Sequence, residues 1–133
     1  MIALDTNVLA RYIVRDDPRQ TATATGLIES MCTKDEPGII TITVLCELVW
    51  VLDCGYKYDR PLIANTIKRI LSSDDLLVEQ SELAWQALNL YMSGKADFAD
   101  YVIGLSGKEL NAKTTYTFDK KTSTCGLFTA MKL

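Results

Sequence analysis

Hydrophobic and polar residues follow two different periods along this chain, and each period predicts one kind of element. Short apolar or β-branched runs at residues 2–4, 39–41, 76–78, 114–118 and 127–130 are typical of strands. Between these runs, apolar residues recur every three or four positions, which predicts helices. We expect helices over 8–14, 18–32, 43–53, from 59 onward, and over 81–92 and 97–110. Strands that alternate with helices indicate an α/β fold with a mostly parallel sheet.

No repeat, linker or low-complexity stretch divides the chain, so residues 1–133 are expected to form a single domain. Local signals support the helix boundaries. Asp17 is a suitable N-cap, Pro18 suits the first helical position, and Gln20 completes a pattern close to a capping box.

Glu47 interrupts the most apolar predicted helix, in which residues 44–52 are otherwise apolar. An apolar sequence on every side predicts a buried helix. Because burying an unpaired carboxylate is costly, Glu47 must be protonated, paired with a base or bound to a cation. No lysine or arginine lies within a helical turn of it. A buried ion pair with a base from elsewhere stays open, but a carboxylate that faces a metal fits better.

Two further acids, Asp5 and Asp119, each follow a predicted strand. Ligands of parallel-sheet proteins bind outside the carboxyl ends of the strands, so both acids suit a binding site. The alternative for Asp119 is an aspartate that caps a turn or helix. Lys120 and Lys121 follow it and suit either a phosphate contact or plain solvated surface.

Asp97 and Asp100 are three residues apart on a predicted helix and therefore share one face. Gly104 and Gly107 continue that face, whereas the other positions are largely apolar. Asp97 could instead stabilise the start of the helix through the helix dipole. That alternative is weaker for Asp100, which lies one turn inside.

Composition narrows the chemistry that these acids could perform. The chain has no histidine, and its four cysteines form no C-x-x-C pair, which argues against a zinc site. Nucleophile systems that need histidine are excluded as well. An all-oxygen cluster selects hard cations such as Mg²⁺ or Mn²⁺, which support phosphodiester cleavage by activating water.

Charge and hydropathy bear on partners and location. The net charge of −3, from 14 basic and 17 acidic residues, argues against a nucleic-acid binder. Two bound divalent ions would reverse that sign, to about +1. No apolar run reaches the roughly 18 residues of a membrane span, and the N-terminus lacks the features of a signal peptide. We therefore expect no membrane partner and a cytoplasmic location.

Taken in order, these acidic motifs resemble PIN domains. The pattern comprises Asp5-Thr6-Asn7 after the first strand, Glu47, the segment 96–100 with Asp97 and Asp100, and Thr117-Phe118-Asp119. It spans the chain, whose length is similar to that of the single-domain toxin ribonucleases of VapBC-type toxin–antitoxin pairs.

The resemblance implies a three-layer α/β/α sandwich with a central, mostly parallel sheet. It implies an endoribonuclease that depends on Mg²⁺ or Mn²⁺ and acts on RNA. It also implies a homodimer and a cognate antitoxin protein that binds near or in the active site. By position, the catalytic and metal-binding residues are Asp5, Glu47, Asp100 and Asp119, with Asp97 as a further metal ligand and Thr6 and Asn7 in support.

Other families explain the pattern less well. A phosphatase of the haloacid dehalogenase type needs a second aspartate two residues after the first, where this chain has Asn7. A receiver domain usually has a second acid beside the end of its first strand. An inactive PIN-like module that only binds RNA or protein stays open as an alternative. Arg11 and Arg15 suit either phosphate or antitoxin contacts, or a solvated helix face.

Overall fold

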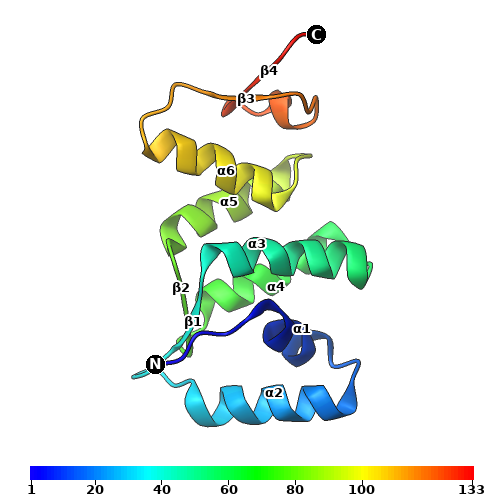
Figure 1. The fold of residues 1–133 in the computed structure, drawn as a ribbon, viewed down its shortest axis with the longest axis vertical. Helices are drawn as coiled ribbons and strands as arrows, with labels where there is room; N and C mark the ends of the chain where they lie inside the picture. The colour runs from blue at the N-terminus through cyan, green and yellow to red at the C-terminus, as the bar shows by residue number, and fades with distance from the viewer. The chain divides into compact units, whose positions relative to one another are not determined.

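The computed structural model describes residues 1–133 as two units, Met1–Ser81 (unit 1) and Glu82–Leu133 (unit 2). Figure 1 traces the elements of both units. Strands are parallel in each unit and alternate with helices along the chain, so the predicted α/β class is confirmed. None of the helices combines the length and the apolar character needed to cross a membrane.

Unit 1 contains three parallel segments. Strand β1 (Gly38–Ile40) pairs with β2 (Leu76–Val78), and Ala3 forms a parallel bridge with Ile39. The N-terminal segment is held beside β1 by backbone hydrogen bonds from Leu4 to Ile39 (2.9 Å) and from Ile39 to Ile2 (2.7 Å). The three carboxyl ends therefore lie at one edge, although the first segment contributes only a bridge.

Unit 1 also contains four α-helices: α1 (Thr6–Val14), α2 (Pro18–Met31), α3 (Ile42–Trp50) and α4 (Arg60–Ser72). Helix α3 continues into a π-helical turn, η1 (Val51–Gly55). The expected cap at Asp17 is confirmed, since its carboxylate accepts the N–H of Gln20 at 3.1 Å with Pro18 in the first turn. Asp59 begins α4 in the same way, by accepting the N–H of Leu62 at 2.9 Å.

The prediction that α3 is buried on every side is wrong. Leu45 and Leu48 are fully buried and Val49 nearly so, whereas Thr43 and Glu47 are exposed and Trp50 is 66% exposed. Residues 43, 47 and 50 share one face at helical period, and that face is open to solvent. Apolar composition alone misled the prediction, because burial depends on which neighbours cover each face.

Unit 2 contains α5 (Ser81–Ser93) and α6 (Phe98–Glu109). The first residue of α5, Ser81, is also the last residue of unit 1. Strand β3 (Thr115–Thr117) pairs in parallel with β4 (Phe128–Ala130), and the 3₁₀ turn η2 (Thr122–Thr124) lies between them. The rings of Tyr91 and Phe98 pack edge to face, with centroids 6.0 Å apart, and join α5 to α6. The strands predicted at 114–118 and 127–130 are confirmed, although each is shorter.

Candidate functional site

Asp5 lies where the first parallel segment of unit 1 passes into α1. It is the N-cap of that helix, and its Oδ1 accepts the backbone N–H of Thr6 at 2.8 Å. The side chain is exposed. The carboxylate therefore stands at the carboxyl end of the segment beside β1, as the sequence predicted.

Thr6 connects Asp5 to Glu47. Its side chain is only 5% exposed, and its hydroxyl donates a hydrogen bond to Oε1 of Glu47 on α3. Thr6 thus contacts one carboxylate through its backbone N–H and the other through its hydroxyl. The sequence interpretation placed Thr6 beside the first aspartate, and the structure adds its contact with Glu47, 41 residues away.

The burial argument for Glu47 does not hold, because this side chain is exposed. Two other observations still set it apart. It lies next to Asp5 through Thr6, and within unit 1 neither carboxylate forms an ion pair with a lysine or arginine. Each acid also uses only one oxygen in these hydrogen bonds, which leaves Oδ2 of Asp5 and Oε2 of Glu47 free for a ligand.

A third acid, which was not predicted from the sequence, lies at this edge of unit 1. Glu79 follows β2 directly, and its Oε1 accepts the N–H of Ile42 at 3.0 Å, at the start of α3. Thr41 holds the same helix end by accepting the N–H of Val44 at 3.3 Å. The signal was present, since Glu79 follows a strand just as Asp5 does. Glu79 therefore ties the end of β2 to the helix that carries Glu47.

In unit 2, Asp97 and Asp100 lie close together at the start of α6, as predicted, but Asp100 belongs to the first turn and not to the next one. The helix-start role that the sequence made weaker for Asp100 therefore fits it as well. Asp97 is the exposed N-cap, and half-buried Asp100 accepts the backbone N–H of Asp97 at 3.2 Å. The alternative role of Asp97 at the helix start also fits this geometry. Gly104 on the same helix has a packing role, because a Cβ there would lie 2.8 Å from the ring of Phe128.

Asp119 lies in the turn after β3, on the exposed surface. Its Oδ1 accepts the backbone N–H of Lys121 at 2.8 Å, and its own N–H donates to Oγ1 of Thr117 at 3.0 Å. The hydrogen bond from Lys121 is the main cause that lowers the pKa of Asp119 below its usual value. The acid therefore shapes the turn and remains ionised at neutral pH.

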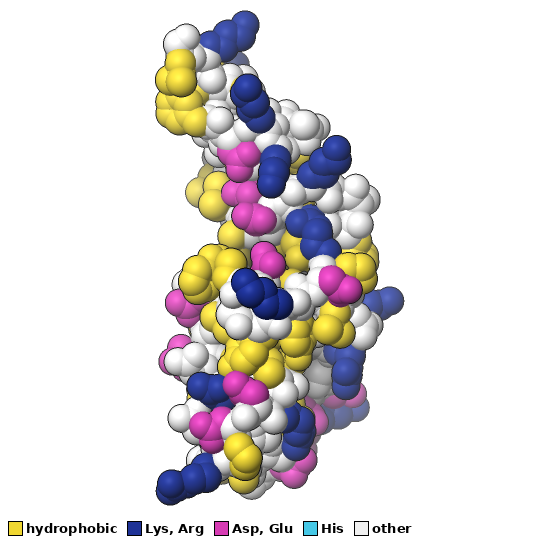
Figure 2. All heavy atoms as spheres, turned by 90° about the vertical axis from the view of Figure 1, so that its right-hand side faces the viewer, with side chains coloured by type: hydrophobic (Ala, Val, Ile, Leu, Met, Phe, Trp, Pro, Cys, Tyr) yellow, Lys and Arg dark blue, Asp and Glu magenta, His cyan; other side chains and the backbone are white.

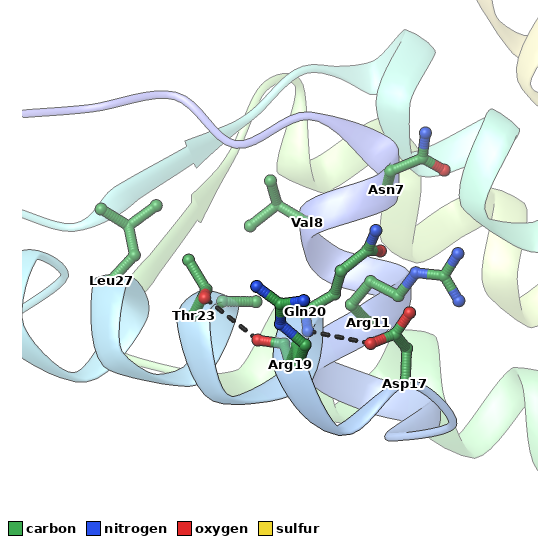
Figure 3. Close-up of a pocket in the computed structure, with 9 residues that line it drawn as sticks. Asn7, Val8, Arg11, Asp17, Arg19, Gln20, Thr23 and Leu27 are labelled. Carbon is green, nitrogen blue, oxygen red and sulfur yellow. Dashed lines mark hydrogen bonds between the residues drawn. The ribbon is translucent and has the colours of Figure 1, made fainter.

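Asn7 is exposed and lines a cavity of about 570 Å³ between α1 and α2, shown in Figure 3. Arg11 also lines this cavity, but its guanidinium donates to Asp16 at 2.9 Å and to the hydroxyl of Tyr56 at 3.0 Å. The hydrogen bond from Arg11 to Asp16 is the main cause that lowers the pKa of Asp16 below its usual value. Arg11 therefore already has partners within unit 1.

The predicted acids are divided between the units: Asp5 and Glu47 belong to unit 1, and Asp97, Asp100 and Asp119 belong to unit 2. Within either unit, no three acids or cysteines gather closely enough to hold a metal ion. The donors of unit 1 nevertheless suit a hard cation, because they are carboxylate oxygens without a basic partner. Lysine and arginine side chains are spread along the face in Figure 2, with acids between them.

Comparison with known proteins agrees with this pattern. The family model described as PIN domain matches residues 2–124. The chain is 26% identical over 129 residues to a VapC ribonuclease of Aquifex aeolicus (strain VF5), a match that covers 97% of this chain and 95% of the relative. No solved structure matches the chain. Because the family model covers nearly the whole sequence, the chain belongs to the PIN domain family.

Proposed function

We propose that this protein is a metal-dependent endoribonuclease that cleaves the phosphodiester bonds of RNA. Membership of the PIN domain family and the similarity to a VapC ribonuclease support this activity. The structural observation that carries the proposal is the position of Thr6 between two carboxylates. It holds one oxygen of Asp5 and one oxygen of Glu47, and it leaves the second oxygen of each available.

The proposed site comprises Asp5, Glu47, Asp100 and Asp119 as catalytic residues, with Asp97 as a further metal ligand. This site requires that residues 1–133 form one domain, which we propose to be a three-layer α/β/α sandwich. The family model supports a single domain, because its match spans residues of both units.

Mg²⁺, or alternatively Mn²⁺, is the cation that this all-oxygen donor set suits. A bound ion of this kind lowers the pKa of a coordinated water and stabilises the leaving oxygen in phosphodiester cleavage. The protein contributes orientation. The hydroxyl of Thr6 fixes Glu47, its N–H fixes Asp5, and Glu79 with Thr41 fixes the start of α3. Because the chain has no histidine, imidazole cannot transfer protons, and carboxylates are the titratable groups that the proposed site contains.

The relative also bears on the biological setting. We propose that the protein is the toxin of a toxin–antitoxin pair, acts in the cytoplasm, forms a homodimer and is inhibited by a cognate antitoxin protein. The name of the Aquifex aeolicus relative supports the first of these statements. Asn7, at the start of α1, is proposed to support the acids beside it.

The Asp5→Asn substitution tests the proposed activity. Asparagine caps helices as well as aspartate, so α1 should keep its stability while the site loses a negative ligand. We expect purified wild-type protein to cut RNA with Mg²⁺ or Mn²⁺, and Asp5→Asn to lose at least about 10²-fold in rate. Asp17→Asn is the matched control, because Asp17 caps α2 in the same unit. It should cleave normally.

Two results would reject the proposal. Cleavage by Asp5→Asn at the wild-type rate would remove Asp5 from the site. Wild-type protein that binds RNA without cutting it, with either metal, would point to an inactive binding module. Expression in bacteria gives a second measurement, since growth arrest should occur with wild type and Asp17→Asn but not with Asp5→Asn.

A further inference from the structure

A second cavity of unit 1 lies at the end of α1 opposite to Asp5. Its volume is about 400 Å³. It is lined by the end of α1, the end of α4 and the first residue of β2, and its polar lining residues are Tyr12, Arg15, Thr66, Arg69 and Ser73. The nine residues of α1 place it roughly 14 Å along the helix from the candidate acids. The lining includes two arginines and no acid.

Arg15 and Arg69 have no partners. Neither guanidinium forms an ion pair or a hydrogen bond, in contrast to Arg11, which pairs with Asp16. Cations often lie at helix C-termini to satisfy the last carbonyls. Here backbone groups do part of that work, because the N–H of Arg15 donates to the carbonyl of Arg11 at 3.1 Å and the N–H of Ser73 to that of Ile70 at 3.2 Å. Because no carboxylate or carbonyl accepts a hydrogen bond from either guanidinium, both groups keep their donors free.

The backbone conformation of Arg15 also distinguishes this end of α1. Arg15 has φ of 60°, the left-handed conformation in which helices usually end with glycine. A side chain at such a position costs free energy relative to glycine. Arg15 therefore keeps a long cationic side chain at a position that lines the cavity, although glycine would suit the backbone better.

Hydroxyl groups complete the set of donors. Oγ of Ser73 accepts the N–H of Asp75 at 3.2 Å, which leaves its O–H to donate. The O–H of Tyr12 has no partner. Thr66 is excluded as a donor, because its hydroxyl already donates to the carbonyl of Leu62 at 2.8 Å. The cavity thus offers two guanidinium forks and two hydroxyls.

We propose that this cavity binds a phosphate group, held by Arg15 and Arg69 with Ser73 and Tyr12 as further donors. Guanidinium forks match the oxygens of phosphate and can bind them in pairs. The proposal goes beyond the nuclease, since it needs neither the metal nor cleavage. The phosphate could belong to a small molecule or to the backbone of an RNA chain.

Binding of inorganic phosphate tests the site directly. We expect calorimetry at low ionic strength to give saturable binding to the full-length wild-type protein, and Arg69→Gln to raise the dissociation constant about tenfold or more. Lys68→Gln is the matched control, because it removes one positive charge from the same helix outside the cavity. It should bind phosphate like wild type. The proposal would be overturned if Arg69→Gln and Lys68→Gln weakened phosphate binding equally. It would also be overturned if phosphate showed no saturable binding to the wild-type protein.

Arg15→Gly separates binding from folding. Glycine accepts the left-handed conformation of residue 15, so the thermal midpoint should stay level or rise while phosphate binding weakens. Unchanged phosphate binding by Arg15→Gly would count against the site.

The source of the phosphate is distinguished with uncleaved RNA. In an Asp5→Asn background, Arg69→Gln should weaken binding of single-stranded RNA if the backbone is the source. If a small molecule is the source, Arg69→Gln should weaken the binding of inorganic phosphate and nucleotides and leave the binding of RNA unchanged. Failure of RNA cleavage by the wild type would leave these measurements unaffected, so the two proposals fail separately.

Discussion

Thr6 is the residue on which the candidate site of unit 1 depends. Its buried position fixes the direction of its hydroxyl, and that hydroxyl fixes one oxygen of Glu47. The sequence predicted Asp5 and Glu47 as separate acids but offered no way to see that Thr6 connects them. A contact between residues 41 positions apart depends on how α1 packs against α3, which no local pattern contains.

Thr6→Val should uncouple the two acids while keeping the shape of the side chain. We expect the rate of RNA cleavage to fall by about 10- to 100-fold, because misplacement of a catalytic group by about 1 Å has that effect. The free energy of unfolding should fall by only about 1 kcal/mol, since exposed Glu47 regains water. Urea unfolding and steady-state kinetics measure both. Thr6→Ser, which keeps the hydroxyl, should restore most activity, and failure to do so would contradict the role of the hydrogen bond.

Cys46 offers a test of burial that does not depend on activity. Burial raises the pKa of its thiol to about 11, whereas the Cys54 side chain is exposed. Only roughly one part in a thousand of Cys46 is then thiolate at pH 8, and the thiolate is the reactive form. We expect a thiol reagent to label Cys54 within minutes and Cys46 far more slowly until the protein unfolds. Mass spectrometry of the labelled peptides distinguishes them, and fast labelling of Cys46 would show that its environment is more open.

At the scale of elements, the sequence predicted starts and ends well and burial less well. The caps of α2 and α4 and the strand β2 follow from local chemistry, such as Asp17 before Pro18, so they could be read directly. Helix α3 shows the opposite case. Its apolar residues form a wide stripe, and only its neighbours decide that Leu48 is covered and Trp50 is not.

Two alanine substitutions on α3 check which face is buried. Leu48 is fully buried, so Leu48→Ala should lower the free energy of unfolding by about 2–5 kcal/mol through lost burial and a cavity. Trp50 is 66% exposed, and Trp50→Ala should change it by no more than about 0.5 kcal/mol. Urea denaturation of both variants gives the comparison. A large loss for Trp50→Ala would mean that another surface covers this face in solution.

At the scale of the molecule, the acids of unit 2 show why a sequence predicts members of a site more easily than their roles. Asp97 and Asp100 organise the first turn of α6, and Asp119 organises the turn after β3. These are the structural roles weighed as alternatives to metal binding. A carboxylate has two oxygens, so Asp119 can hold the N–H of Lys121 with one and remain able to bind a cation with the other. Local geometry therefore fits both roles.

Metal-linked stability decides whether acids of both units bind one cation. A ligand that binds only the folded protein at about 100 times its dissociation constant adds about 2.7 kcal/mol to the free energy of unfolding. We expect Mn²⁺ to raise the thermal midpoint of wild type and of the Asp17→Asn control. Asp5→Asn and Asp119→Asn should each lose most of this rise, although asparagine preserves the hydrogen bonds that both side chains accept. If Asp119→Asn responds to Mn²⁺ like wild type while Asp5→Asn does not, the cation is bound without Asp119.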